Sequence, residues 1–250
     1  MGNIYVKNHD LLREIHISKS SYCFFIEEKY NEYHLIISSL SKIDNEKINI
    51  ARRNYIIKNG DDPENISDLV FRVITYSHIP ENFLKNKKKN SNSIKLNFIP
   101  FKHYIIEKTS SSSLFNKPVY KFKEVGRSHW KGNLETGKFS VDHGNLTHNL
   151  ALMIQKIVDN YSQKSNWRGY TWLEDMKSQA ILQLIESALK FDETKSNNPF
   201  AYFTCIIANA FKGTINSEDK ISQIKNLKLI EKGFNGSFNF QLDYEMNDDN

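Results

Sequence analysis

Cysteine is scarce in this chain, whose 250 residues include only Cys23 and Cys205. The two stand far apart, each within an apolar stretch. A disulfide-stapled domain needs several half-cystines, and a Cys-based zinc site needs closely spaced pairs, so the sequence favours neither class. Two isolated cysteines are typical of reduced thiols in a cytosolic protein.

Uninterrupted apolar runs are also missing. No stretch approaches the roughly 18 apolar residues that a membrane-spanning helix needs. The N-terminal segment MGNIYVKNHD lacks the apolar core of a signal peptide. We therefore expect neither secretion nor membrane spanning, and we place the protein in the cytoplasm.

Sequence signatures of catalysis are absent as well. The chain has no glycine-rich phosphate loop, no HExxH and no nucleophile elbow. His129, His143 and His148 lie near Asp142, but histidines without such a motif are more often packed or surface residues. We therefore predict that the protein is not an enzyme and uses no metal or cofactor.

The excess of positive charge is small. The 34 Lys and Arg residues against 29 Asp and Glu give a formal charge of +5 and a pI near 8.9. This balance permits a nucleic-acid partner but is too weak to establish one. With 39% hydrophobic residues, a chain of this length can build one large or two small cores.

In the N-terminal part, helical spacing predominates. Apolar residues recur at helical intervals around 11–15, 33–40 and 48–57, so we expect the first sixty residues to be mostly helical. Gly60 and Pro63 then favour a turn. Residues 69–74 are predicted to be a strand or a buried segment, and short strands are predicted at 96–99 and 104–106. The polar tracts 85–93 and 110–113 are predicted to be exposed loops or disordered.

After about residue 145, helical periodicity becomes sustained. One apolar face runs through Leu146–Val158, and a second follows the capping-box pattern of Thr171 and Glu174. A third helix is predicted to begin at Asn198-Pro199, because asparagine caps free amides and proline fits the first helical position. We expect Gly213 to end it.

These patterns predict a mainly α fold: an α-rich chain with a small mixed α/β N-terminal part and a C-terminal helical bundle. We divide the chain into a mixed region (1–140), a helical domain (141–216), a basic amphipathic helix (217–236) and an acidic, hydrophobic tail (237–250).

Three motifs in the helical domain carry a family resemblance. They are Asn166-Trp167-Arg168-Gly169-Tyr170-Thr171, Leu189-Lys190-Phe191-Asp192-Glu193-Thr194-Lys195 and Asn198-Pro199-Phe200-Ala201-Tyr202-Phe203-Thr204. The stretch 146–216 resembles the second conserved region of bacterial sigma factors, and in particular the late-transcription sigma factors of T-even-type and marine, cyanophage-like tailed bacteriophages. The resemblance implies a promoter-recognition subunit that acts in the cytoplasm of an infected bacterium.

By this resemblance, the second helix docks on the clamp helices of the largest subunit of host core RNA polymerase. The residues that match this face by position are Asp175, Ser178, Gln179, Leu182, Gln183 and Glu186. The alternative for each is an ordinary solvated helix surface.

The resemblance also implies that the third helix recognises and melts a minus-ten-like element of AT-rich late promoters. The matching DNA-binding residues are Phe200, Tyr202, Phe203, Thr204, Ile206, Ile207, Asn209 and Lys212. Primary sigma factors place paired tryptophans where this chain has Ile206 and Ile207, so stacking on a base falls to the aromatic residues. The alternative is that Phe203, Ile206 and Ile207 are simply core residues.

The tail resembles the motif with which phage late sigma factors bind the DNA sliding clamp. Its apolar anchors would be Phe238, Phe240, Leu242 and Tyr244. A tail strand or a disordered acidic end is the alternative. For the whole chain, the rival function is a regulator that binds RNA polymerase or the sliding clamp without recognising a promoter.

Overall fold

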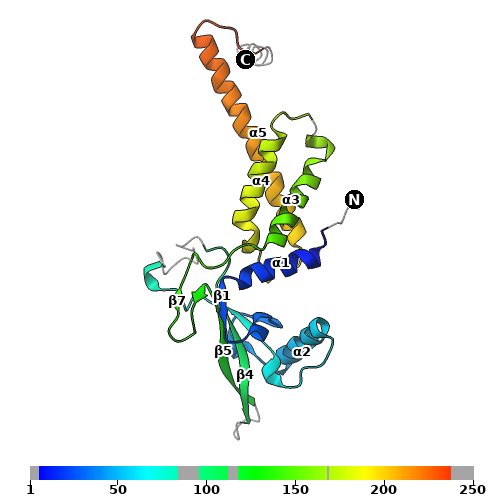
Figure 1. Cartoon of the computed structure of the whole chain (residues 1–250), viewed down its shortest axis with the longest axis vertical. Helices are drawn as coiled ribbons and strands as arrows, with labels where there is room; N and C mark the ends of the chain where they lie inside the picture. Colours follow the sequence, from blue (N-terminus) through cyan, green and yellow to red (C-terminus); the bar gives the residue numbers. More distant parts are fainter. Residues whose placement is uncertain (1–5, 84–95, 112–117, 168, 238–250) are drawn as a thin grey trace. The chain divides into compact units, whose positions relative to one another are not determined.

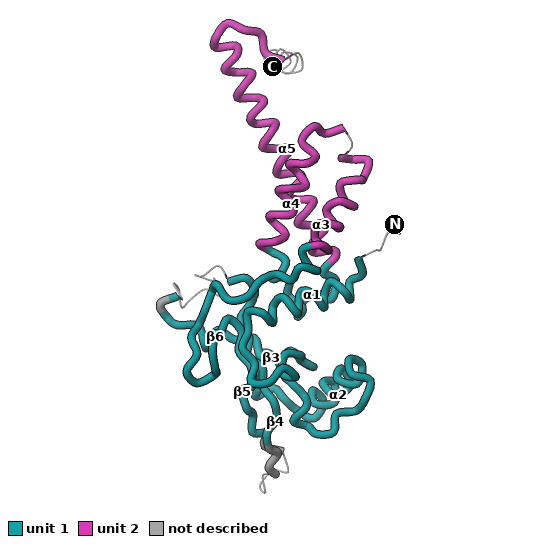
Figure 2. Tube along the Cα trace, viewed as in Figure 1, with its two compact units in different colours: residues 1–151, 187–199 teal, residues 152–186, 200–250 magenta. Residues whose placement is uncertain are grey.

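The computed structural model describes residues 6–83, 96–111, 118–167 and 169–237. The chain divides into two compact units, which Figure 2 colours separately. We call residues 1–151 with 187–199 the sheet unit, and residues 152–186 with 200–250 the helical unit.

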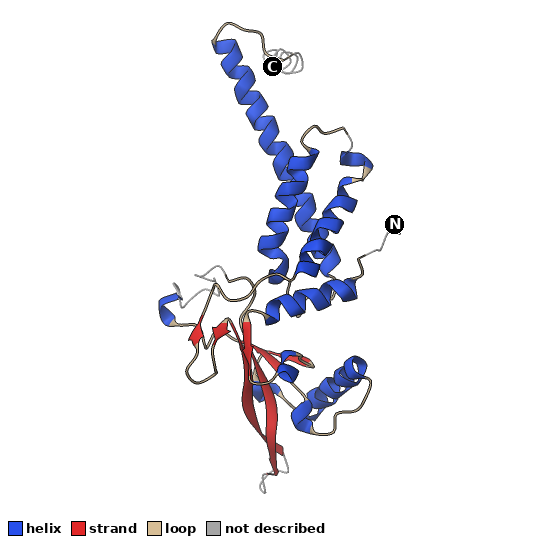
Figure 3. Cartoon of the chain, in the orientation of Figure 1, coloured by secondary structure: helices blue, strands red, loops and turns tan. Residues whose placement is uncertain are grey.

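Five α-helices and seven strands lie in the described residues (Figures 1 and 3). The helices are α1 (Asn8–Ser20), α2 (Asn45–Asn59), α3 (His148–Ser162), α4 (Leu173–Ser187) and α5 (Pro199–Glu231). The strands are β1 (Cys23–Phe25), β2 (Leu35–Ile37), β3 (Phe71–Ile74), β4 (Phe101–Ser111), β5 (Pro118–Ser128), β6 (Trp130–Lys131) and β7 (Lys138–Phe139). Short 3-10 turns join several of them, including η6 (Ala188–Lys190).

A mixed five-stranded sheet organises the sheet unit, in the order β1-β5-β4-β3-β2. All neighbours are antiparallel except β2 and β3, which run parallel. A parallel pair needs a crossover connection, and α2 lies in the segment that joins these two strands. Strands β6 and β7 form a separate two-stranded sheet.

Helix α2 has clear signals at both ends. The Asp44 side chain accepts a hydrogen bond from the backbone N–H of Lys47 at 2.9 Å, and Gly60 closes the helix with φ +88°. Its residues Ile48 and Ala51 belong to one buried apolar cluster with Phe71 of β3 and Ile106 of β4. The helix therefore covers one face of the sheet.

In the helical unit, α3 contacts both α4 and α5. Lys177 of α4 lies 3.0 Å from the carboxylate of Asp159 in α3. The ring of Tyr161 in α3 meets that of Phe211 in α5 edge-on, with centroids 5.5 Å apart. Ile154 and Ile157 are nearly buried. The side chains of this unit that have no exposed surface are Val158, Met176, Ala180, Leu184, Phe203, Ile207, Ala210 and Phe211.

The structure corrects the predicted fold class. The chain is 53% helical and 15% strand and is mixed α/β rather than mainly α. Residues 35–37, inside an expected helix, form β2, and strand β4 continues into the Ser tract expected to be a loop. The strands predicted within 69–74 and 104–106 are confirmed, whereas residues 96–99 form none.

The predicted end of the third helix at Gly213 is wrong. Helix α5 continues through Gly213 to Glu231, so the helix and the basic amphipathic segment form one element of 33 residues. A glycine inside an exposed helix costs only about 1 kcal/mol relative to alanine, which the flanking turns can offset.

Candidate functional site

The second helix of the helical unit, α4, has one buried and one exposed face. Met176, Ala180 and Leu184 recur every four residues and have no exposed surface. Glu174 and Asp175 stand in the first turn, where carboxylates interact favourably with the helix dipole. The helix is thus fixed by its apolar side, and its other side is free to meet a partner.

The residues matched to a polymerase-binding face gather on this exposed side. Asp175, Ser178, Gln179, Leu182 and Glu186 are all exposed, and Gln183 is half-buried. The face also includes two large apolar side chains, Leu182 at 58% and Ile185 at 45% exposure. Exposed apolar residues ringed by polar ones are the usual composition of a protein-binding surface. The sequence analysis missed Ile185, which follows Leu182 at helical spacing.

The proposed DNA-binding residues are not brought together on one surface. Phe203 and Ile207 have no exposed surface and belong to the core of the helical unit. Buried in this way, neither side chain is available to stack on or wedge against a base. The alternative interpretation, that these two are core residues, is the one their burial supports.

The remaining residues of that set lie on two flanks of α5. Tyr202, Ile206 and Asn209 follow one another at helical spacing, with the first two half-buried and Asn209 exposed. Phe200, 37% exposed, and Thr204 stand on the opposite flank, where the Thr204 hydroxyl donates to the Phe200 carbonyl at 2.8 Å. Partial burial raises the pKa of Tyr202, so its hydroxyl stays protonated.

Charge gives this part of α5 little attraction for DNA. Lys212 is exposed and is the one basic residue of the matched set. From Asn166 through Lys220, six Lys or Arg residues face seven Asp or Glu. Phosphate contacts supply most non-specific affinity, so this stretch should bind DNA weakly by itself.

The turn before α5 carries a second motif of the resemblance. Leu189 and Phe191 are buried, and Asp192 accepts hydrogen bonds from the backbone N–H and the hydroxyl of Thr194 at 3.0 and 2.6 Å. Burial alone would raise the pKa of Asp192, but the bonds from Thr194 and Lys195 outweigh it and lower the pKa. Glu193 accepts from the buried Lys19 ammonium at 2.9 Å. These residues therefore serve the fold of the sheet unit.

The four proposed clamp-binding residues, Phe238, Phe240, Leu242 and Tyr244, lie outside the described residues.

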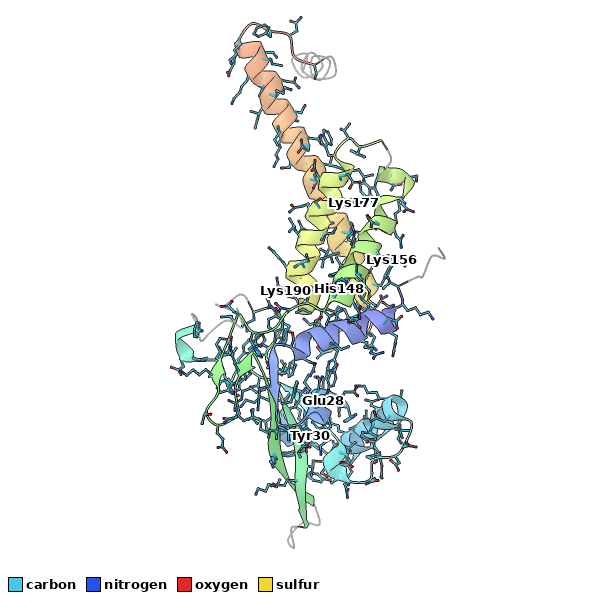
Figure 4. All side chains as sticks on the ribbon, viewed as in Figure 1. Glu28, Tyr30, His148, Lys156, Lys177 and Lys190 are labelled. Carbon is cyan, nitrogen blue, oxygen red and sulfur yellow. The ribbon has the colours of Figure 1, made fainter. Side chains whose placement is uncertain are left out.

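The sheet unit has its own cavity, of about 520 Å³, beside Glu28 and Tyr30, which Figure 4 labels. His34 lines it, with its Nδ1 accepting the Val70 N–H at 2.9 Å. Burial lowers the pKa of His34 to about 4, so the imidazole is neutral at pH 7. Within the described part of the chain, no group of three metal-ligating side chains is found, and no helix is both long and apolar enough to cross a bilayer.

The most unusual polar cluster of the sheet unit has no signature in the sequence. Arg72, 2% exposed, places its guanidinium 3.8 Å from the ring centres of both Tyr33 and Phe101. Its Nε donates to Nε2 of His103 at 2.9 Å, so the proton of His103 sits on Nδ1, which donates to the Tyr30 carbonyl. Arg72 is one alternating residue of a buried strand, and nothing in that pattern marks it.

Compared with protein-family models, curated proteins and solved structures, the chain has no match in any of the three.

Proposed function

We propose that this chain is a sigma-type initiation factor of a tailed bacteriophage, which binds host core RNA polymerase and directs it to AT-rich late promoters. The supporting observation is the exposed face of α4, where Leu182 and Ile185 stand among Asp175, Gln179 and Glu186. It coincides with the face that the sequence resemblance assigns to the clamp helices of the largest polymerase subunit.

In this proposal, fewer residues of α5 recognise the promoter than the sequence resemblance implied. The accessible flank of α5, with Tyr202, Ile206 and Asn209, contacts the melted element, while Phe203 and Ile207 support the helix from below. Tyr202 stacks on an unpaired base, as aromatic side chains do in single-strand binding. Because residues 166–220 are nearly neutral in charge, polymerase has to supply most of the DNA affinity.

One observation favours the rival function, a polymerase-binding regulator without promoter recognition. Of the three residues Phe203, Ile206 and Ile207, which match the base-contacting positions of the family, two are in the core. A regulator needs only the exposed face of α4. The two functions therefore share the polymerase contact and differ in the role of α5.

The test is run-off transcription from an AT-rich late-type promoter with host core polymerase, alongside a direct measurement of polymerase binding. Leu182→Arg should abolish both binding and transcription, because it places a charge at the centre of the apolar contact. Leu152→Arg is the matched control, since Leu152 is 50% exposed on α3 of the same unit. Equal binding by the two variants would contradict the proposed face.

Variants of α5 then separate the two functions. Tyr202→Ala and Asn209→Ala should each weaken binding to fork-junction DNA in the presence of polymerase, while polymerase binding itself stays at the wild-type level. The opposite flank provides the control, Thr204→Val. Transcription that never depends on this protein, despite normal polymerase binding, would favour the regulator.

A further inference from the structure

The cavity beside Glu28 and Tyr30 (Figure 4) is acidic, although the chain as a whole carries a formal charge of +5. Glu28, Glu32 and Asp68 line it with three carboxylates, and Lys29 supplies the one ammonium among the described residues that line it. Three negative groups against one positive group give the lining a charge of −2. At about 520 Å³ the cavity has the size of a ligand site. Its charge attracts cations and repels phosphate groups.

Two of these carboxylates have no partner in the described part of the chain. Glu28 and Glu32 are exposed, and neither side chain forms an ion pair or a hydrogen bond there. Two lysines of this region are engaged elsewhere, since Lys29 lies 2.9 Å from the carboxylate of Glu27 and Lys58 donates to a backbone carbonyl at 2.6 Å. Glu28 and Glu32 are therefore free to pair with a cation from another molecule.

The ring of His34 is held in one orientation at the same cavity. The residue is 5% exposed, and its backbone N–H donates to the Val70 carbonyl at 2.8 Å. The Val70 N–H donates in turn to Nδ1 of His34 at 2.9 Å, and the Tyr55 ring lies 4.9 Å from the imidazole. Because Nδ1 accepts a hydrogen bond, the proton of the neutral imidazole is on Nε2.

The Nε2–H of His34 opens onto the cavity without a partner. It donates to no acceptor in the described residues, yet Nε2 is not one of the side-chain nitrogens that the protein encloses completely. His34 is a lining residue, so this nitrogen faces the cavity. A nearly buried donor gains most from an acceptor that fits the cavity, because bulk water reaches it poorly. The cavity therefore offers a donor as well as carboxylates, and a metal ion alone would not satisfy both.

We propose that the cavity binds a basic residue, whose ammonium or guanidinium pairs with Glu28 and Glu32 and whose carbonyl oxygen accepts from Nε2 of His34. Tyr30 and Tyr55 also line the cavity, and aromatic rings bind guanidinium groups and aliphatic stems. The residue belongs to a peptide segment of a partner protein or is a free amino acid, and both sources present the same groups. The site needs neither polymerase nor DNA, so its failure and that of promoter recognition are distinguishable.

The first test titrates the full chain with Nα-acetyl-L-arginine amide and follows the ring protons of His34 by NMR, which their contact with the Tyr55 ring identifies. A saturable shift with a dissociation constant of about 1 mM is expected for a ligand of this size. The citrulline analogue has the same shape but no charge, and it should bind about tenfold more weakly. Equal binding of the two compounds, or no shift at His34, would overturn the proposal.

Two further compounds test the carbonyl contact and the source of the residue. Butylguanidine keeps the cation and the stem but lacks the carbonyl, so it should bind roughly fivefold more weakly than the amide. Binding as tight as that of the amide would contradict the contact with His34 and overturn the proposal. Free L-arginine adds a carboxylate to an acidic cavity. Tighter binding of the amide therefore assigns the site to a peptide, and tighter binding of free arginine assigns it to the amino acid; either result supports a site for a basic residue.

Variants of the lining provide the second test. Glu28→Gln with Glu32→Gln should weaken binding of the amide about tenfold, because it removes the two unpaired carboxylates. The matched control is Glu64→Gln with Glu135→Gln, two exposed glutamates of the sheet unit that do not line the cavity, and binding should stay within about twofold of wild type. All four side chains are exposed, so none of these substitutions removes a core contact. An equal loss in the control would show that general negative charge attracts the probe, and it would sink the proposal.

Discussion

In the sheet unit the buried side chains include Lys19, Arg72, His34, His78, His103 and His129, whereas the described part of the helical unit buries only Ser162 and Asn226 among its polar residues. All eight histidines of the chain also fall within the sheet unit. One unit is held by apolar packing, and the other adds a network of buried polar groups. Burying a polar group is costly unless it stays paired, so the two units should respond differently to pH and to substitution.

Acid should produce the largest difference. Burial lowers the pKa of His129 to about 3 and those of His34 and His78 to about 4, against 6.5 for a free imidazole. Between those values the unfolded chain binds protons that the folded chain does not, so this stability is complete above pH 6.5 and is lost as the pH falls. At pH 5 each histidine should cost roughly 2 kcal/mol, and the sum is comparable to the stability of a whole domain.

Hydrogen exchange at pH 7.5 and pH 5, corrected for the intrinsic rate, measures this effect. Protection of β3–β5 should fall at pH 5, while that of α4 and the first half of α5 should persist. Equal loss in both units would remove the distinction between them.

Phe203→Ala should cause the next largest loss of stability, and this loss should fall on the helical unit. Its ring is fully buried, and truncating a core phenylalanine typically costs 3–5 kcal/mol. Chemical denaturation should show this loss, and exchange should locate it in α3–α5 rather than in the sheet. Polymerase binding and promoter opening should decline together. A stable Phe203→Ala protein that binds polymerase but fails to open promoters would instead mean that Phe203 contacts a base.

The stability cost of removing a paired lysine can be compared directly between the two units. Lys19 is 4% exposed at its side chain and bonds Glu193 and the Phe191 carbonyl at 2.9 and 2.8 Å, so Lys19→Met removes both bonds from the sheet unit and leaves the Glu193 carboxylate without its cation. The expected cost is about 3 kcal/mol. Lys177, 22% exposed and 3.0 Å from Asp159, is the counterpart in the helical unit, and Lys177→Met should cost only about 0.5 kcal/mol.

Urea denaturation of the two variants measures the difference. Adding Glu193→Leu to Lys19→Met should recover part of the loss, because it removes the unpaired carboxylate. Similar costs for Lys19→Met and Lys177→Met would show that burial does not distinguish the pairs.

Gly213→Ala should have the smallest effect, and it should be stabilising. A Cβ at Gly213 would meet nothing within 4 Å, and the residue lies inside α5. Alanine there should raise the free energy of unfolding by about 0.5–1 kcal/mol. A loss of stability in thermal denaturation would mean that the helix ends at Gly213 in a left-handed turn, as the sequence suggested.

Sequence patterns were most informative where one periodicity was long and uninterrupted. The cores of α3 and α4 and the start of α5 at Pro199 all follow from spacing and capping residues. The sheet was underestimated because β4 and β5 mix lysines, serines and apolar residues, and their pairing depends on partners distant in sequence.

The candidate site shows a different limit. The exposed face of α4 was predictable, since the positions opposite Met176, Ala180 and Leu184 have to face outward. The role of Phe203 and Ile207 was not, because a helix with apolar residues at these intervals has the same sequence pattern whether they fill a core or wedge apart bases. Only their burial distinguishes the two.

The continuity of α5 links the angular positions of its two halves. At 3.6 residues per turn, Asn209 and Lys225 are separated by about 160° around the axis, and the 33-residue helix is about 50 Å long. A single residue inserted near Gly213 would turn everything beyond it by about 100°, while four would nearly restore the register. The helix therefore acts as one rigid element, and a partner that binds one end fixes the direction that the side chains at the other end face.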